Sequence, residues 1–357
     1  MQPYLYIFLF SLFSTFLSLI YKKADTYLSV ILLTTLILFI GLRYNSVDYF
    51  SYWSIYDNIK ESGLSAFSNE KGFTLLNLVE QKTTGHFFYF IFFFSLMSLG
   101  IKYSAFKKMV PYITLSLLLY VSSSLFWKDL GQIRNGFIAG TTLYALYFAY
   151  KKMPIKFALV ILIASQIHMV AILCTPIYFA NRFKNKETML TILLGAFIVS
   201  VLGGVGHFII SNIPADTLGQ VSLRANSYAG SIYDAKKNVL GLASLSNLFL
   251  TMFFIYNYDR LIKVSKLNTY LIPIAVISLT SAYLLSDFLI LSSRVEDAFY
   301  TPCLIVLLSS IPLIVKNSQR LLIFAAIFIY CVASFGHSYV NTATSYQSIV
   351  KSSLIVR

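Results

Sequence analysis

Residues 43–73 read RYNSVDYFSYWSIYDNIKESGLSAFSNEKGF, and this polar, aromatic stretch interrupts a chain that is otherwise built from long apolar runs. It carries seven of the chain's charged residues, whereas the runs before it, 3–20 and 27–42, carry none. A membrane-spanning helix needs about 20 predominantly apolar residues. The contrast predicts membrane helices that are joined, over residues 43–85, by a long loop.

The composition of the whole chain agrees with a membrane protein. Of its 357 residues, 57% are hydrophobic and only 12% are charged. Soluble domains carry about a quarter charged residues, so this chain lacks the polar surface of a water-soluble globule. The net charge of +14 is interpreted as basic cytoplasmic loops and not as nucleic-acid binding.

The apolar runs predict an all-α, polytopic membrane helical bundle of about ten transmembrane helices. The whole chain, 1–357, is expected to form one integral-membrane domain, and its first helix is expected to be retained. The predicted spans are 3–20, 27–42, 86–103, 109–127, 132–150, 188–212, 241–258, 269–291, 297–315 and 321–339.

The charges between these runs predict an orientation. Short basic segments mark the cytoplasmic side of a membrane protein. They lie at 22–23, 102–108, 151–156, 182–186, 260–266 and 316–320. The longer segments 43–85 and 213–240, and the short ones at 128–131 and 292–296, are then predicted to face outward, together with both termini.

Residues 155–180 form an apolar run that both begins and ends at a basic segment. One crossing would carry the second basic segment outside, and the run is too short for two full spans. It is therefore predicted to be a re-entrant hairpin with His168 at its tip. Irregular backbone at that depth must be buried in protein or line a wet cavity. One tilted helix that breaks the charge rule is the alternative.

Several chemical classes find no support in the sequence. The three cysteines, Cys174, Cys303 and Cys331, lie in apolar runs without a CxxC pair, so neither a zinc site nor a disulfide framework is indicated. HExxH, GxGxxG, Walker and DxD patterns are missing, and so is a GxSxG elbow. A metal-independent site without a bound cofactor is expected.

The predicted topology gathers scattered polar side chains on the outer side. Arginines match the geometry of phosphate groups, and a carboxylate or histidine is a candidate base. These residues also have purely structural interpretations. The arginines could extend to the lipid headgroups, the histidine could be a core residue, and the aromatic residues could form an interfacial belt. Asp48 is also a candidate partner of Arg43. The polar candidates are Arg43, Asp48, Tyr49, Glu70, Lys128, Gln132, Arg134, His168, Asp287 and Arg294.

Four short motifs in this order, GLRYNSVDYFSYW, NEKGF, QIRNGFIAG and SQIHMVA, resemble those of the EpsG family of Wzy-type polysaccharide polymerases. A late arginine followed by aromatic residues fits the family loosely. The first motif departs from the family in a spacer that is one residue shorter, and the second has Lys71 where proline is usual. The matching positions are Arg43, Asp48, Tyr49, Tyr52, Glu70, Gly72, Phe73, Gln132, Arg134, His168, Arg294, Phe299 and Tyr300.

The resemblance implies a GT-C-like glycosyltransferase of the bacterial inner (cytoplasmic) membrane with its active site facing the periplasm. Its substrates would be undecaprenyl-diphosphate-linked oligosaccharide repeat units, and its product O antigen, capsule or exopolysaccharide. A polysaccharide chain-length regulator is an expected partner. The alternatives left open are a lipid-linked oligosaccharide flippase or transporter, an O-antigen ligase-type transferase and a membrane acyltransferase.

The convergence of the candidate residues on one face, together with the motif match, indicates their roles. Glu70 and Asp48 are the first candidate catalytic bases, and His168 is the third. The others would bind the substrate or its diphosphate: Arg43, Tyr49, Lys128, Gln132, Arg134 and Arg294.

Overall fold

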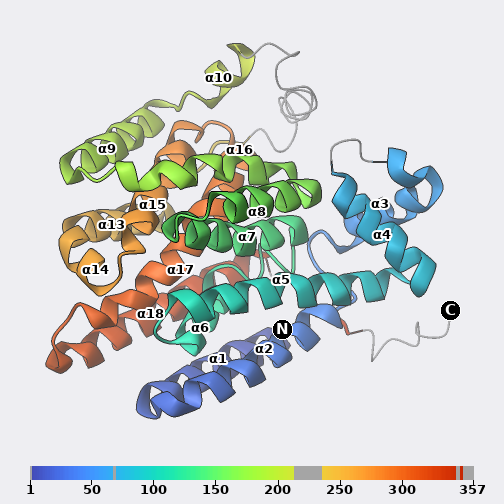
Figure 1. Cartoon of the computed structure of the whole chain (residues 1–357), viewed down its shortest axis with the longest axis horizontal. Helices are drawn as coiled ribbons and strands as arrows, with labels where there is room; N and C mark the ends of the chain where they lie inside the picture. The colour runs from blue at the N-terminus through green and yellow to red at the C-terminus, as the bar shows by residue number, and fades with distance from the viewer. Residues whose placement is uncertain (1, 67–69, 213–234, 343–345, 349–357) are drawn as a thin grey trace. The chain divides into compact units, whose positions relative to one another are not determined.

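The structure, a computed structural model, describes residues 2–66, 70–212, 235–342 and 346–348 (Figure 1). Regular structure in these residues is entirely helical, which confirms the predicted polytopic helical membrane protein. Much of the predicted outer segment 213–240 lies outside the described residues. The helices long and apolar enough to cross a membrane are Pro3–Ile20, Lys22–Gly41, Phe87–Met109, Leu289–Leu313 and Asn317–Asn341.

The chain divides into two compact units. Unit 1 contains Met1–Tyr178 and Leu308–Arg357, and unit 2 contains Phe179–Leu307. In unit 1, α5 packs against α2 and α7, and α6 packs against α1, α2 and α18. The helices of unit 1 are α1 Gln2–Ile20, α2 Asp25–Gly41, α3 Tyr49–Ser62, α4 Lys71–Thr83, α5 Phe87–Met109, α6 Ile113–Ser123, α7 Ile133–Tyr150, α8 Pro154–Ile167 and α18 Asn317–Thr342.

Unit 2 is centred on α15, which packs against α9 and α13. The predicted break at 292–296 is wrong, because α16, a π-helical turn (Glu296–Tyr300), α17 and a 3₁₀ turn run on as one apolar helix, Leu289–Leu313. Arg294 therefore lies inside a helix and not in an outer loop. The helices of unit 2 are α9 Lys186–Leu202, α10 Gly206–Asn212, α13 Leu242–Tyr256, α14 Tyr258–Val264, α15 Asn268–Leu284 and α16 Leu289–Val295, and α17 Thr301–Ser310 begins in unit 2 and ends in unit 1.

The predicted loop 43–85 is largely helical, since α3 and α4 fill most of it beside the start of α5 (Figure 1). The hydroxyl of Tyr56 on α3 donates to the carboxylate of Glu80 on α4, and Gln81 Nε2 donates to the Tyr56 carbonyl at 2.7 Å. These bonds fasten the two amphipathic helices to each other. The segment is thus a folded helical pair that presents a defined surface.

Residues 155–180 form the predicted hairpin. Helix α8 ends at Ile167, His168 is extended (φ −155°), and a 3₁₀ helix, η3, continues over Met169–Arg182. The rings of Phe157 and Tyr178 meet at 5.2 Å, so the two arms run back alongside each other with His168 at the tip. How deep the hairpin lies in a bilayer remains a prediction.

The predicted span 109–127 differs from the observed chain. Helix α6 has only 11 residues, and residues 124–132 continue as wide, mostly buried turns. Three of their amides bond five residues back: Leu125 to Tyr120 at 3.1 Å, Leu130 to Leu125 at 3.1 Å and Gln132 to Trp127 at 3.0 Å. Backbone inside a bilayer must find its hydrogen bonds within the protein, and these three amides do so.

Two charged residues lie elsewhere than predicted. Lys102, expected in a cytoplasmic segment, is buried within α5, seven residues before its end, which is about 10 Å along the helix. Asp129, expected in an outer loop, pairs with it, the Lys102 Nζ to Asp129 Oδ2 distance being 2.8 Å. Residues 124–132 therefore lie beside the middle of α5. Hydropathy could not reveal this, because a paired lysine in a helix and a loop lysine look alike in sequence.

The beginning of α6 depends on Asp25 from the start of α2. Its carboxylate accepts the Ile113 amide at 2.9 Å, the Thr114 amide at 3.1 Å and the Thr114 hydroxyl at 2.6 Å. Asp25→Ala should leave buried donors unsatisfied and destabilise the protein by about 1–3 kcal/mol. Thermal unfolding in detergent measures this.

The matched control is Asp259→Ala, which removes an exposed ion pair with Lys186 (2.6 Å). Exposed pairs contribute about 1 kcal/mol or less. Equal effects of the two substitutions on the unfolding temperature would contradict the role of Asp25.

Candidate active site

The carboxylate of Glu70 is the point at which three separate segments of unit 1 meet. Glu70 is the N-cap of α4 and is 1% exposed. Its Oε1 lies 2.7 Å from His168 Nδ1 and accepts the Met169 amide at 3.2 Å. Its Oε2 forms an ion pair with Arg134 Nη1. The structure thus brings Glu70, Arg134 and His168 of the predicted set together.

Close packing of α4 on α8 brings Glu70 within hydrogen-bonding distance of His168. A Cβ on Gly72 would lie 2.7 Å from Gln166 Cβ and 3.0 Å from the Gln166 carbonyl oxygen. Only glycine fits at this point of contact. The glycine of NEKGF and the glutamine of SQIH therefore share one packing contact, two residues away from the Glu70–His168 hydrogen bond.

Arg134, the second residue of α7, is held by aromatic rings as well as by Glu70. Its guanidinium carbon lies 5.1 Å from the ring centre of Phe73 and 5.8 Å from that of Tyr52. Phe73 in turn packs edge-on against Phe90 and Phe94 of α5, at 5.6 and 6.1 Å. A desolvated cation over aromatic faces is stabilised by about 2 kcal/mol. All four motifs therefore contribute a side chain to one cluster.

Gln132 shapes the beginning of α7 instead of joining the Glu70 cluster. It is the N-cap of α7, and its Oε1 accepts Asn135 Nδ2 at 2.5 Å. The side chain of Arg134 is 15% exposed, whereas those of His168 and Glu70 are 8% and 1% exposed. Arg134 is therefore the member of the cluster that a ligand reaches most directly.

The electrostatics of the cluster assign Glu70 a fixed charge. Burial alone would raise its pKa, but the hydrogen bond with His168 and the positive charge of Arg134 outweigh burial and lower the pKa to about 2. A carboxylate with so low a pKa is a weak base at neutral pH. What this carboxylate does well is orient the His168 ring and pair with the positive charge of Arg134.

Arg43 and Lys128 do not line this cluster. Both are buried, at 0% and 1% exposure. Arg43 donates from Nη1 to the Ile40 carbonyl at 2.8 Å and from Nε to Ser46 Oγ at 3.2 Å, so its hydrogen bonds do not go to Asp48. Burial lowers the pKa of Arg43 to about 10. Neither cation offers a surface to a diphosphate in this conformation.

Tyr49 and Asp48 lie at the beginning of α3. Asp48 is its half-buried N-cap. Tyr49 is 2% exposed and packs against Phe87 and Tyr44, with ring centres at 5.2 and 5.7 Å. Burial raises the pKa of Tyr49 to about 12. Tyr49 therefore belongs to the packing of α3 on α5 and not to an open stacking platform.

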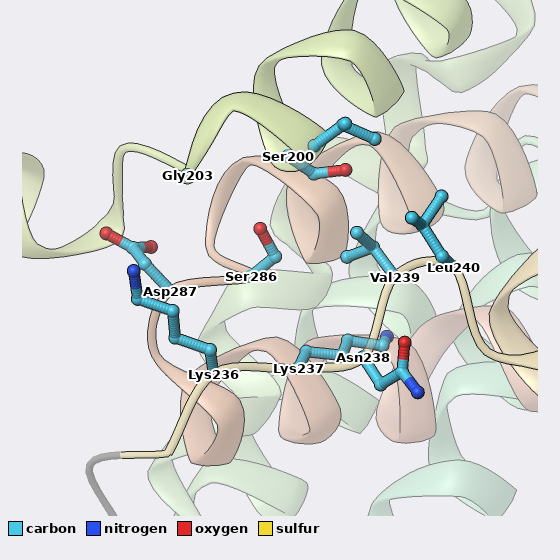
Figure 2. Close-up of a pocket in the computed structure, with 10 residues that line it drawn as sticks. Ser200, Gly203, Lys236, Lys237, Asn238, Val239, Leu240, Ser286 and Asp287 are labelled. Atoms are coloured by element: carbon cyan, nitrogen blue, oxygen red, sulfur yellow. The ribbon is translucent and has the colours of Figure 1, made fainter.

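The remaining candidates, Arg294 and Asp287, belong to unit 2. Asp287 accepts the Gly206 amide at 2.7 Å and the His207 amide at 2.9 Å. It also borders a pocket of about 240 Å³ (Figure 2). Lys237, in the same pocket wall, pairs with Glu296. Asp287 and Lys237 are thus engaged within unit 2, and the pocket contains no residue of the four motifs. Its other polar lining residues are Ser200, Lys236, Asn238 and Ser286.

Sequence reasoning missed the partners that complete the cluster. The Met169 amide, the contact between Gly72 and Gln166, and the rings beneath Arg134 become visible only in the fold. The aromatic residues of the first two motifs were the available signal. Among the residues that the structure describes, no group of three or more His, Cys, Asp or Glu side chains is placed to hold a metal ion.

The low pKa of Glu70 predicts a pH dependence of stability. Its pKa falls from the ordinary 4.5 to about 2 on folding, so between these values the unfolded chain binds more protons. The stabilisation is fully present above pH 4.5 and is lost as the pH falls toward 2. Thermal unfolding of wild type and Glu70→Gln through this window measures it. The variant should show the flatter curve, and identical slopes would contradict the assignment.

Gly72→Ala tests the packing contact separately from the charge. The added methyl group collides with Gln166, so we expect α4 to shift. A misplacement of about 1 Å should lower the rate of the reaction at this site by about 100-fold. Gly100→Ala is the matched control, because a Cβ there meets nothing within 4 Å. Activity per folded protein is the measurement. Equal activities of the two variants would show that the contact is not needed.

The chain is similar to known proteins over a range that includes these site residues. The model of the EpsG family matches residues 26–351, a range that includes all four motifs. The AmsC protein of Erwinia amylovora, described as an amylovoran biosynthesis protein, is 26% identical over 345 residues, which cover 92% of this chain and 89% of AmsC. No solved structure matches the chain significantly. The chain belongs to the EpsG family.

Proposed function

We propose that this protein is a polysaccharide polymerase that joins polyprenyl-diphosphate-linked oligosaccharide repeat units at the outer face of the bacterial inner membrane. Membership of the EpsG family and similarity to AmsC, a protein of amylovoran biosynthesis, support a polymerase. The observation that carries the proposal is the buried Glu70 carboxylate, which holds a histidine and an arginine side by side. A base next to a phosphate-binding cation is what glycosyl transfer from a diphosphate requires.

The reaction transfers the growing glycan from its lipid carrier to a new repeat unit. A hydroxyl of the acceptor sugar attacks the anomeric carbon of the donor. The new glycosidic C–O bond forms, the bond from that carbon to the phosphate oxygen breaks, and polyprenyl diphosphate leaves with the bonding electrons. The acceptor proton must go to a base, and the leaving group gains negative charge that must be stabilised.

His168 is the proposed base. The candidate bases indicated by the sequence also include Glu70 and Asp48, but a carboxylate such as that of Glu70, whose pKa is about 2, accepts a proton poorly. The Glu70 oxygen at 2.7 Å from His168 Nδ1 fixes the orientation of the ring and stabilises the imidazolium that forms. Glu70 is therefore assigned a supporting role beside His168.

Arg134 is the proposed ligand of the diphosphate. A guanidinium group carries five N–H donors in a planar fork, and its ion pair with Glu70 involves Nη1. Its partial exposure next to the buried carboxylate allows a phosphate oxygen to approach. Its positive charge would stabilise the charge that develops on the leaving group.

A reconstituted assay tests these roles. The purified protein is given lipid-linked repeat units extracted from a strain that lacks the gene, and chain length is read on a gel. Wild type should build a ladder. We expect His168→Gln to lower the rate by about 10²- to 10⁴-fold and Arg134→Ala by about 10²- to 10³-fold. Lys152→Ala, an exposed lysine outside the motifs, is the control and should keep the wild-type rate.

The deletion strain itself discriminates between the classes of function. Single repeat units on the cell surface would support a polymerase, because export and attachment still occur. Lipid-linked units that accumulate inside, with no surface glycan, would instead indicate a flippase. A normal ladder in the deletion strain, or full activity of both His168→Gln and Arg134→Ala, would contradict the proposal.

A further inference from the structure

A second buried acid–cation pair lies in unit 1, outside the four motifs' charged residues. Lys102 on α5 and Asp129 in the wide turns are 3% and 2% exposed, with Nζ and Oδ2 2.8 Å apart. Asp129 Oδ1 also accepts the Ser98 hydroxyl at 2.6 Å, and its Oδ2 accepts the Tyr120 hydroxyl. Three segments, α5, α6 and residues 124–132, are thereby tied to one carboxylate.

Stability alone does not account for this pair. Burying two charges costs several kcal/mol that their attraction seldom exceeds. Lys102 moreover lies within a candidate membrane span, Phe87–Met109. Charged residues inside such spans are rare and usually serve a function. The pair is thus a candidate for a role in the site.

Both partners face the first two turns of α7. A Cβ on Gly136 would lie 2.8 Å from Asp129 Oδ1, and a Cβ on Gly140 would lie 3.2 Å from Lys102 Cγ. These two glycines of QIRNGFIAG let α7 rest directly on the ion pair. Arg134 lies two residues before Gly136. At 3.6 residues per turn, Arg134 and Gly136 point to nearly opposite faces of the helix.

We propose that Lys102 and Asp129 are a positioning pair, which fixes the first turn of α7 and so sets where Arg134 meets Glu70 and the substrate diphosphate. This inference rests on the proposed function. Neither residue is accessible to a substrate, so they act through α7 and not by contact. The opposite faces of one helical turn are held by two buried acid–cation pairs, Glu70–Arg134 and Asp129–Lys102.

The test separates positioning from stability by removing the charges singly and together. Lys102→Met and Asp129→Asn each leave one buried charge unpaired and should lower the unfolding temperature. The double variant has no unpaired charge and should regain thermal stability. A positioning role predicts that kcat of the stable double variant, at saturating lipid-linked repeat unit, stays about 10- to 100-fold below wild type.

Tyr144→Phe is the matched control. It removes another hydrogen bond between the same two helices, from Tyr144 Oη to Ser104 Oγ at 2.9 Å, away from the first turn of α7. It should keep the wild-type kcat. A double variant that is both stable and fully active would overturn the inference, and so would an equal loss of kcat in Tyr144→Phe.

Dependence on Arg134 provides the second readout. If the pair acts through Arg134, then Asp129→Asn should lower kcat much less in an Arg134→Lys background than in wild type. The same fold-loss in both backgrounds would overturn the inference. Failure of the wild-type protein to elongate repeat units would instead contradict the proposed function itself. The results for the variants bear only on the positioning pair.

Discussion

The burial of one carboxylate, that of Glu70, organises unit 1 around the site. A buried charge is tolerated only when it is paired and hydrogen-bonded. Glu70 obtains Arg134 from α7, and His168 with the Met169 amide from the hairpin tip. The N-terminus of a helix disfavours a cation, so Arg134 at the second position of α7 needs this carboxylate as much as the carboxylate needs it.

Interrupted helices are what bring these groups to one place. The chain breaks at His168 between α8 and η3, and wide turns replace helix over residues 124–132. Straight spans would carry their polar groups to the two membrane surfaces. These breaks instead present side chains and amides inside the protein, as discontinuous helices of membrane proteins do at their binding sites.

The sequence predicted those parts of the fold that depend on a single property, such as apolar length or the position of basic residues. Apolar length predicted membrane helices, and the alternation of basic segments predicted the hairpin at 155–180. Patterns that depend on packing were out of reach. The lysine at 102 counts as a loop charge in any one-dimensional reading, yet it is buried against Asp129. Likewise Arg294 looked like the end of a span, because the mostly polar residues 292–297 resemble a loop in the sequence, although α16 continues through Arg294 into a π-helical turn.

For the candidate site, too, the sequence indicated which residues belong together, but not the properties that depend on packing. Motif order brought Glu70, Arg134 and His168 into one candidate set. From the sequence, the carboxylates ranked before His168 as bases, because the strength of a base depends on neighbours that the sequence does not show. The contacts of Glu70 with His168 and Arg134 lower its pKa to about 2, and this moves the proposed base from the carboxylate to the imidazole. Arg43 and Lys128 were equally plausible ligands as cations, and only their burial sets them apart.

The double use of Glu70 also connects substrate binding to catalysis in the proposed reaction. A diphosphate that engages the Arg134 guanidinium competes with Glu70 for the same positive charge. As that ion pair weakens, Glu70 still holds His168 through the contact of 2.7 Å between its Oε1 and His168 Nδ1. In the proposed reaction the two oxygens of one carboxylate therefore have separate tasks. Oε1 keeps the base in place, while Oε2 shares the arginine with the leaving group.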